Sequence, residues 1–183
     1  ALVESEEKFR SLGENVVDWV WQVDHNGAYT YVSPQVKTIM GYEPAEIIGK
    51  TPFDFMTDEE ASRVGALFAE IVDRQERIQN IEDRLLARDG REILFETNAT
   101  PLFDSNGELA GYMGTCRNIT ERKEAELALR ESEERYRSLV ENMQVGVALI
   151  DRDMRLLSIN RQFREWFPDV EIGEFPKCYE ALF

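Results

Sequence analysis

Few side chains in this sequence could act as catalytic groups or bind a metal ion. The chain has one histidine, His25, and two cysteines, Cys116 and Cys178, which do not form a C-x-x-C pair. His25 lies in the turn-forming run Asp24–Gly27, so we expect it to face solvent and not to serve as a base or phosphate acceptor. No glycine-rich phosphate loop follows an apolar strand. The residues therefore indicate a binding or regulatory module, with no catalytic residues and no metal site.

Composition restricts the partners and the cellular location. The 183 residues include 36 acidic and 21 basic side chains, which give a net charge of −15, and 43% of the residues are hydrophobic. The length fits one domain and part of a second. A surface this acidic repels phosphate groups, so we expect neither nucleic-acid binding nor direct membrane contact. Sparse cysteines and the lack of a long apolar run or signal peptide favour the cytoplasm.

One segment occurs twice. Residues 4–15 are repeated at residues 131–142, an offset of 127, with nine of the twelve positions identical. This interval is too long for a solenoid repeat and fits a small domain with its connecting helix. The offset also relates Asp24 to Asp151 and Val32 to Ile159. We therefore expect a complete domain followed by the beginning of a second copy.

The repeated segment resembles a charged helix with a narrow apolar seam. Apolar or small residues recur at alternating intervals of three and four, and the seam includes Phe9, Leu12, Leu129, Tyr136 and Leu139. Such spacing is typical of a short parallel coiled coil, and we favour a homodimer formed through this seam. Packing of the same face onto its own domain is the alternative.

The chain between the two charged helices mixes strands and helices. We predict strands over 19–23, 28–33, 80–88, 91–101 and 109–118, and helices over 34–42, 44–48 and 58–74. Glycine and aspartate runs mark the hairpin turns. This order predicts an α+β fold, with a five-stranded antiparallel sheet and helices on one of its faces.

Several motifs in this order resemble those of a PAS domain, a sensory module of bacterial signalling proteins. They are Asp24–Gly27, Tyr31–Pro34, Gly41–Lys50, Arg88–Gly90 and the closing run Gly111–Lys123. The resemblance implies an N-terminal helix over 1–13, a complete PAS domain over 14–119, a linker helix over 120–142 and a partial second PAS domain over 143–183. It also implies that residue 183 is a boundary inside a longer protein.

The resemblance places a pocket between the inner face of the sheet and the short helices. Strand alternation, phased by that resemblance, gives the candidate pocket residues Trp21, Val23, Tyr29, Tyr31, Phe53, Phe55, Leu85, Phe95, Thr97 and Cys116. The alternative is that these bulky side chains fill a dry core.

Two cofactors of PAS-like sensors can be tested by position. Relatives that form a flavin–cysteine adduct carry the reactive cysteine three residues after the glycine that resembles Gly49, and here that position is Pro52. Their flavin-contacting glutamine corresponds to Cys116. Haem in this family usually requires a histidine ligand, and His25 lies in a turn. We therefore expect no covalent flavin and no histidine-ligated haem, and the small molecule stays unidentified.

The resemblance also suggests how a signal leaves the domain. The usual Asp-Ile-Thr at the end of the last strand is Asn118-Ile119-Thr120 here, and an asparagine can still cap the following helix. Asn118 and Thr120 are therefore the predicted relay residues, and Asn118 with Glu121 has the spacing of a capping box. The output, a histidine kinase or a cyclic-dinucleotide enzyme in the same polypeptide, would lie downstream. A ligand-free dimerisation and spacer element is the alternative function.

Overall fold

The computed structural model describes residues 18–170 and residue 177. The chain divides into two compact units, one ending at Lys123 and the other beginning at Glu124. The predicted N-terminal helix, its seam residues Phe9 and Leu12, and Cys178 lie outside the described residues.

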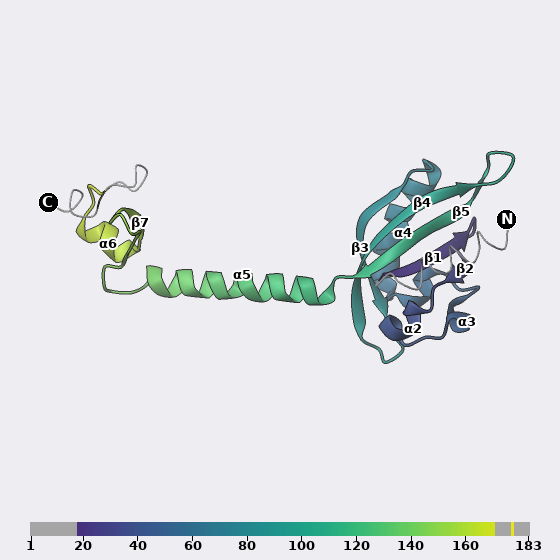
Figure 1. Cartoon of the computed structure of the whole chain (residues 1–183), viewed down its shortest axis with the longest axis horizontal. Helices are drawn as coiled ribbons and strands as arrows, with labels where there is room; N and C mark the ends of the chain where they lie inside the picture. The colour runs from purple at the N-terminus through teal and green to yellow at the C-terminus, as the bar shows by residue number, and fades with distance from the viewer. Residues whose placement is uncertain (1–17, 171–176, 178–183) are drawn as a thin grey trace. The chain divides into compact units, whose positions relative to one another are not determined.

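The first unit is built on an antiparallel sheet. Its strands are β1 (Trp19–Asp24), β2 (Tyr29–Val32), β3 (Ile78–Leu86), β4 (Glu92–Phe103) and β5 (Leu109–Asn118). They are hydrogen-bonded in the order β2-β1-β5-β4-β3, so β1 from the start of the domain lies beside β5 from its end (Figure 1). The predicted five-stranded α+β fold is confirmed.

The same local chemistry closes three hairpins. In the first turn, Asp24 Oδ1 accepts hydrogen bonds from the backbone N–H groups of Asn26 (2.8 Å) and Ala28 (3.0 Å). Asp104 and Asp151 accept the equivalent pair of hydrogen bonds in their own turns. An aspartate that binds the backbone two and four residues ahead stabilises a tight turn, which explains why these runs are recognisable in the sequence.

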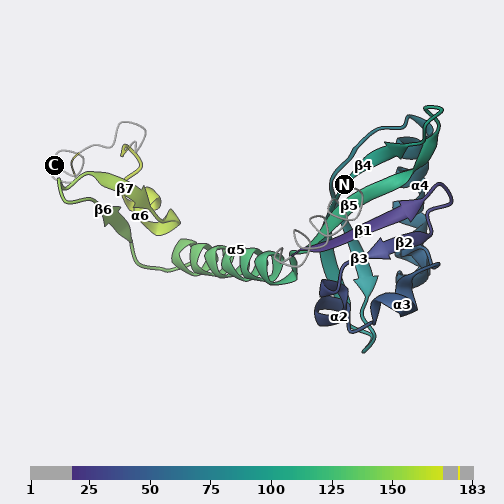
Figure 2. The ribbon, with the colours of Figure 1, turned by 45° about the vertical axis from the view of Figure 1, so that its right-hand side comes forward.

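The helices between β2 and β3 cover one face of the sheet. They are α2 (Gln35–Met40), α3 (Pro44–Ile47), the 3₁₀ helix η1 (Pro52–Phe55) and α4 (Asp58–Asp73), as Figure 2 shows. Helices α3 and η1 each begin with a capping box and a proline in the first turn. These features stabilise very short helices, which alone would not persist in water.

Aromatic side chains fill the core between sheet and helices. Trp19 and Phe95 are fully buried, and their rings meet edge to face with centroids 5.9 Å apart. Trp19 also contacts Tyr29 at 5.8 Å. These contacts join β1, β2 and β4, so the core connects strands that are far apart in the sequence.

Gly114 of β5 permits a close approach inside the sheet. It lies opposite Trp21 of β1, and a Cβ atom at this position would come within 2.3 Å of the carbonyl oxygen of Asn98 and 2.9 Å of Trp21 Cζ2. Only glycine therefore fits between the indole and the backbone of β4. The closing motif thus serves packing as well as strand formation.

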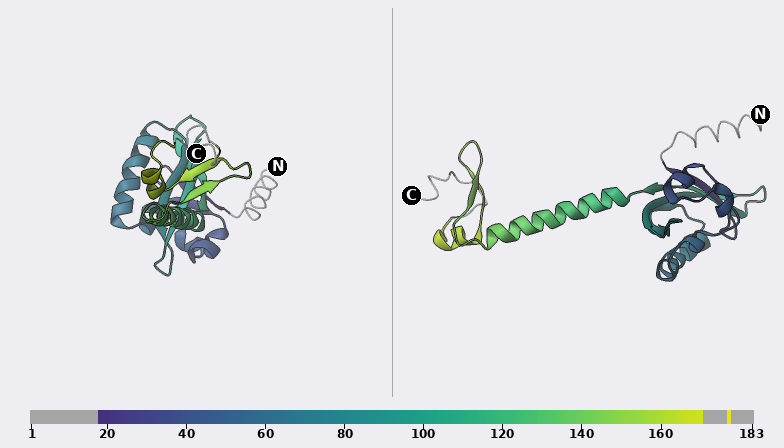
Figure 3. Two further views of the ribbon diagram at one scale, coloured as in Figure 1. Left: turned by 90° about the vertical axis from the view of Figure 1, so that its left-hand side faces the viewer. Right: turned by 90° about the horizontal axis from the view of Figure 1, so that it is seen from below.

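The second unit contains most of α5 (Thr120–Glu141), followed by β6 (Ala148–Ile150), β7 (Leu156–Ile159) and α6 (Arg161–Trp166). Strands β6 and β7 form an antiparallel pair next to α6, visible in the left view of Figure 3. Leu156, Ile159 and Phe163 form its small buried cluster.

The repeat seen in the sequence extends to individual hydrogen bonds. Ser33 Oγ accepts from the N–H of Val20 (3.0 Å), and the N–H of Ser33 donates to the carbonyl of Val20 (2.8 Å). Asn160 and Val147, each 127 positions later, exchange the same two hydrogen bonds at 2.8 and 2.9 Å. The second unit therefore begins with the same local structure as the first.

We predict that Gly114→Ala destabilises the protein. The added methyl group has no space, so the free energy of unfolding should fall by about 1–3 kcal/mol. Gly65→Ala in α4 is the matched control, because its Cβ would meet only Phe53 at an ordinary 3.7 Å. Alanine favours a helix, so this control should be neutral or stabilising by up to about 1 kcal/mol. Urea unfolding of both variants checks the difference, and equal stabilities would contradict the close packing at Gly114.

Candidate ligand cavity

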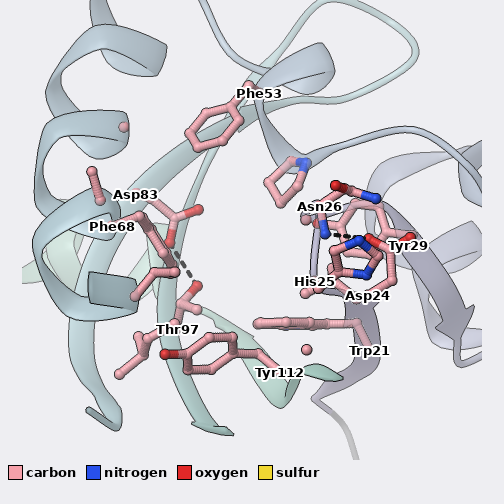
Figure 4. Close-up of a pocket in the computed structure, with 18 of the residues that line it drawn as sticks. Trp21, Asp24, His25, Asn26, Tyr29, Phe53, Phe68, Asp83, Thr97 and Tyr112 are labelled. Atoms are coloured by element: carbon pink, nitrogen blue, oxygen red, sulfur yellow. Dashed lines mark hydrogen bonds between the residues drawn. The ribbon is translucent and has the colours of Figure 1, made fainter. Parts of the chain in front are cut away.

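A cavity of about 310 Å³ lies between the inner face of the sheet, η1 and α4. This volume lies at the lower end of the range for small-molecule sites. In Figure 4, Asp83, Thr97 and Phe68 lie on one side of the cavity. Asp24, His25 and Tyr29 lie on the opposite side. The wall is mainly apolar and aromatic.

The structure brings seven of the ten candidate pocket residues to this cavity: Trp21, Val23, Tyr29, Phe53, Leu85, Thr97 and Cys116. They come from all five strands and from η1.

The other three candidates lie away from the cavity. Tyr31 pairs with Gln22 because a bulge interrupts the β1–β2 register, and this moves its side chain off the inner face. Phe55 is buried against Tyr42, with ring centroids 5.2 Å apart. Phe95 is fully enclosed and packs against Trp19. Strand alternation alone could not detect the bulge or separate core filling from cavity lining.

Some residues that line the cavity are not among the candidates predicted from the sequence. Asp83 of β3 is 4% exposed and lines the cavity in the same phase as Leu85, so its inward position follows from the alternation already used. Tyr112 and Phe68 also line the wall. His25 is exposed, as expected, yet it contributes to the cavity lining through the β1–β2 turn.

A line of polar groups crosses four strands along the cavity wall. Trp21 Nε1–H donates to Cys116 Sγ at 3.1 Å, Thr97 Oγ1 lies 3.2 Å from that sulfur, and Thr97 Oγ1–H donates to Asp83 Oδ1 at 2.6 Å. The single hydroxyl proton of Thr97 is used toward Asp83, so the Cys116 thiol donates to Thr97. Every donor in this line therefore points toward the carboxylate.

Burial controls the charge of Asp83. Removal from water raises the pKa of this carboxyl from 3.8 to about 6, and the nearby Glu60 carboxylate adds to the increase. The Thr97 hydrogen bond and the Arg63 guanidinium oppose it. Arg63 is itself held by Glu60, with Nη2 2.6 Å from Oε1. At neutral pH the cavity therefore contains a carboxylate that is mainly ionised and poorly compensated.

Two further buried polar groups of the wall, Cys116 and Tyr112, are uncharged at neutral pH. Burial, with a contribution from Asp83, raises the pKa of the Cys116 thiol far above its usual range, so Cys116 is no thiolate nucleophile. The Tyr112 hydroxyl is buried and has no hydrogen-bond partner among the described residues. Buried hydroxyls are usually hydrogen-bonded, so this group marks a position where a ligand or water can bind.

The end of β5 is attached to the start of α5 by backbone and side-chain hydrogen bonds. Thr120 Oγ1 accepts from the N–H of Leu94 (3.0 Å), and the N–H of Ile119 donates to the carbonyl of Leu94 (2.9 Å). Asn118 Oδ1 accepts from the N–H of Thr120 at 3.0 Å, one residue earlier than the capping box expected with Glu121. The first turn of α5 is thereby fixed to β4.

The predicted seam residues of α5 are exposed. Leu129, Tyr136 and Leu139 are 63%, 68% and 56% exposed, and none of the described residues of α5 is buried. Within the described part of the chain, no cluster of ligands could hold a metal ion. No helix among those same residues is long and apolar enough to cross a membrane.

Comparison with known families agrees with this geometry. A family model described as the PAS fold matches residues 14–124, and one described as a PAS domain matches residues 134–176. The chain belongs to the PAS family. The sequence-based recognition of a PAS domain followed by part of a second one is confirmed.

Curated relatives of this PAS chain include sensor kinases. It is 26% identical over 128 residues to the methanogenesis regulatory histidine kinase FilI of Methanothrix harundinacea, covering 70% of the chain and 14% of the kinase. It is 29% identical over 137 residues to sporulation kinase C of Bacillus subtilis, covering 72% of this chain and 30% of that kinase. The chain therefore spans less than a third of the length of these relatives.

Solved PAS structures share the fold. A sensory box histidine kinase/response regulator from Burkholderia thailandensis superposes with a TM-score of 0.56 at 27% identity, covering 72% of this chain and 98% of that one. The N-terminal domain of a diguanylate cyclase with a PAS/PAC sensor from Marinobacter aquaeolei gives a TM-score of 0.53 at 18% identity. The match covers 58% of this chain and 98% of that domain. The first unit is thus a sensory PAS domain homologous to those of histidine kinases.

We predict that Asp83→Asn raises the free energy of unfolding above that of the unaltered chain, and that this gain is larger at neutral pH than at acidic pH. Because folding raises the pKa of Asp83 from 3.8 to about 6, its carboxyl favours the folded state at low pH and loses this effect as the pH rises through about 6. The advantage of the variant should grow by about 2 kcal/mol between about pH 4.5 and 7.5.

Denaturant unfolding at the two pH values measures this difference. Glu82→Gln on the same strand is the control, since the exposed Glu82 leaves no buried charge. An advantage of Asp83→Asn that stays constant with pH would contradict the buried, ionised carboxylate.

Proposed function

We propose that the first unit senses a small molecule in the cavity and passes its state through residues 118–142 to the following PAS domain. The observation that carries this proposal is the cavity of about 310 Å³, which holds a buried carboxylate and an unpartnered tyrosine hydroxyl within an aromatic wall. A carboxylate with one hydrogen bond and a hydroxyl with none destabilise a dry core, whereas a bound ligand could supply the missing contacts.

The relay follows from the strand pairing. Cys116 lines the cavity and pairs with Thr97, and two positions along, Asn118 pairs with Phe95. A ligand that moves the Thr97–Cys116 pair therefore also moves the strand segment to which α5 is attached. A shift of this kind changes the direction or rotation of α5, provided that the ligand binds one arrangement better than the other.

We also propose that a kinase or a cyclic-dinucleotide enzyme in the same polypeptide receives the signal in the cytoplasm. The supporting observation is that the relatives named above are much longer sensor kinases. The chain itself would then be a regulatory part and not the catalytic one.

The mass of the purified chain, measured natively and after denaturation, tests the sensor function. We expect a native mass excess that disappears on denaturation, together with an absorption scan that indicates the chemical class of the released molecule. Gly65→Leu should abolish this excess, because the larger side chain extends into the cavity beside Phe53, whereas Gly65→Ala should retain it. A bare mass in both states would count against a resident ligand.

A second candidate function is dimerisation and spacing without a ligand. It is favoured by α5, whose residues Leu129, Tyr136 and Leu139 are all exposed and follow the alternating three- and four-residue spacing. Apolar residues in such a row on a charged helix suit a parallel coiled coil with a second copy of the chain. Both candidates can hold together, since a relay through α5 works best in a dimer.

We predict that Leu129→Glu or Tyr136→Glu converts dimers to monomers. A charge in the seam of a coiled coil would be buried against its symmetry mate, which opposes association. Light scattering should report half the mass of the unaltered chain. Leu127→Glu is the matched control, because Leu127 is equally exposed (59%) on α5 but lies off the seam spacing. If the seam variants and the control keep the same mass, the seam is not the dimer contact.

A further inference from the structure

We propose that the cavity binds a small organic cation, an amine carried on an aromatic or aliphatic body, with the amine hydrogen-bonded to Asp83. This inference rests on the proposed sensor function and specifies the chemistry of its ligand. It assigns Asp83 as the residue that determines the charge of the ligand.

The first observation is the free oxygen of Asp83. Its Oδ1 accepts the hydrogen bond from Thr97, whereas Oδ2 accepts none from the described residues. The donors of Trp21, Cys116 and Thr97 all point along the wall toward this one carboxylate. A buried carboxylate with a single hydrogen bond is costly, and a cationic donor in the cavity would satisfy it.

The second observation concerns the cations of the protein itself, which could otherwise pair with the Asp83 carboxylate. Among the described residues of the cavity wall there is no lysine or arginine. Arg63, whose positive charge acts on Asp83, is engaged by both oxygens of Glu60 and by the carbonyl of Glu82, at 2.6–2.8 Å. Asp24 lines the cavity as well and adds to its negative character.

The rest of the wall suits the body of such a ligand. Trp21, Tyr29, Phe53, Phe68 and Tyr112 present aromatic rings, which attract cations through their faces as well as apolar groups. The unpartnered Tyr112 hydroxyl offers a second polar contact. An amine on an aromatic body therefore matches both the charge and the surface of the cavity.

Anionic ligands are disfavoured by the same features. One relative, 25% identical over 126 residues, is the C4-dicarboxylate transport sensor protein DctS of Rhodobacter capsulatus. In this chain a carboxylate ligand would meet Asp83 and no arginine or lysine among the described lining residues. The proposed ligand of this chain therefore differs in charge from a dicarboxylate.

Three probes of matched size test the proposal: 2-phenylethylamine, 2-phenylethanol and 3-phenylpropionate, titrated into the full chain by calorimetry near neutral pH. We expect the amine to bind about tenfold or more tightly than the alcohol, and the acid most weakly. Asp83→Asn should remove the preference for the amine and leave the alcohol unchanged, whereas the control Glu82→Gln should keep the preference.

The unaltered chain provides a second test that requires no variant. Since the pKa of Asp83 is about 6, affinity for the amine should fall several-fold from about pH 7.5 to 5.5 as the carboxylate is neutralised, while affinity for the alcohol should not change. The groups that face Asp83 are Thr97, Cys116, Tyr29, Glu60 and Arg63. His25 also lines the cavity, so the titration is repeated with His25→Gln, which should retain the pH dependence.

The outcomes separate this inference from the sensor function. Equal affinities for amine and alcohol, or an amine preference that survives in Asp83→Asn, would overturn the assignment of a cation and leave the cavity as a ligand site. Binding of none of the three probes would also overturn it. The sensor function itself is tested separately, by the mass of any molecule released on denaturation and by the loss of that molecule in Gly65→Leu.

Discussion

The close contact of Trp21 with the bare backbone of Gly114 determines much of this domain. The contact joins β1, at the start of the chain segment, to β5 at its end, and it positions the indole along the cavity wall. From there the indole N–H reaches Cys116. Because a side chain at Gly114 would collide with Trp21 and with β4, the sheet packs without strain only with glycine at this position.

The buried carboxylate of Asp83 reduces stability and provides chemical specificity. An ionised group with few partners destabilises the folded state, and a core of this size would be more stable with an apolar residue there. A buried carboxylate at this position is consistent with the proposed role of Asp83 in binding a ligand. The hydrogen bonds from Trp21 through Thr97 give the carboxylate one fixed orientation, so a ligand meets a rigid acceptor.

The cavity and the exit helix share one pair of strands. Thr97 and Cys116 lie at the cavity, and Phe95 and Asn118 lie at the attachment of α5. The second unit repeats the opening of the first down to the hydrogen bonds of Asn160, which correspond to those of Ser33. Along the chain, α5 therefore follows the first PAS unit and precedes the second, and this order of elements is what the proposed relay requires.

The sequence by itself predicted the α+β fold with its five-stranded antiparallel sheet, because turn aspartates, glycines and the alternation of apolar residues act locally and match a known family pattern. The order of the strands within the sheet came only from the structure. The sequence also placed seven of the ten candidate pocket residues at the cavity, since alternation phased by the family resemblance assigns a face to each strand residue. Only the tertiary structure excluded Tyr31, where a bulge shifts the register, and Phe95, which packing encloses. It likewise decided the role of Asp83, because the depth of burial and the direction of a hydrogen bond depend on contacts between distant strands.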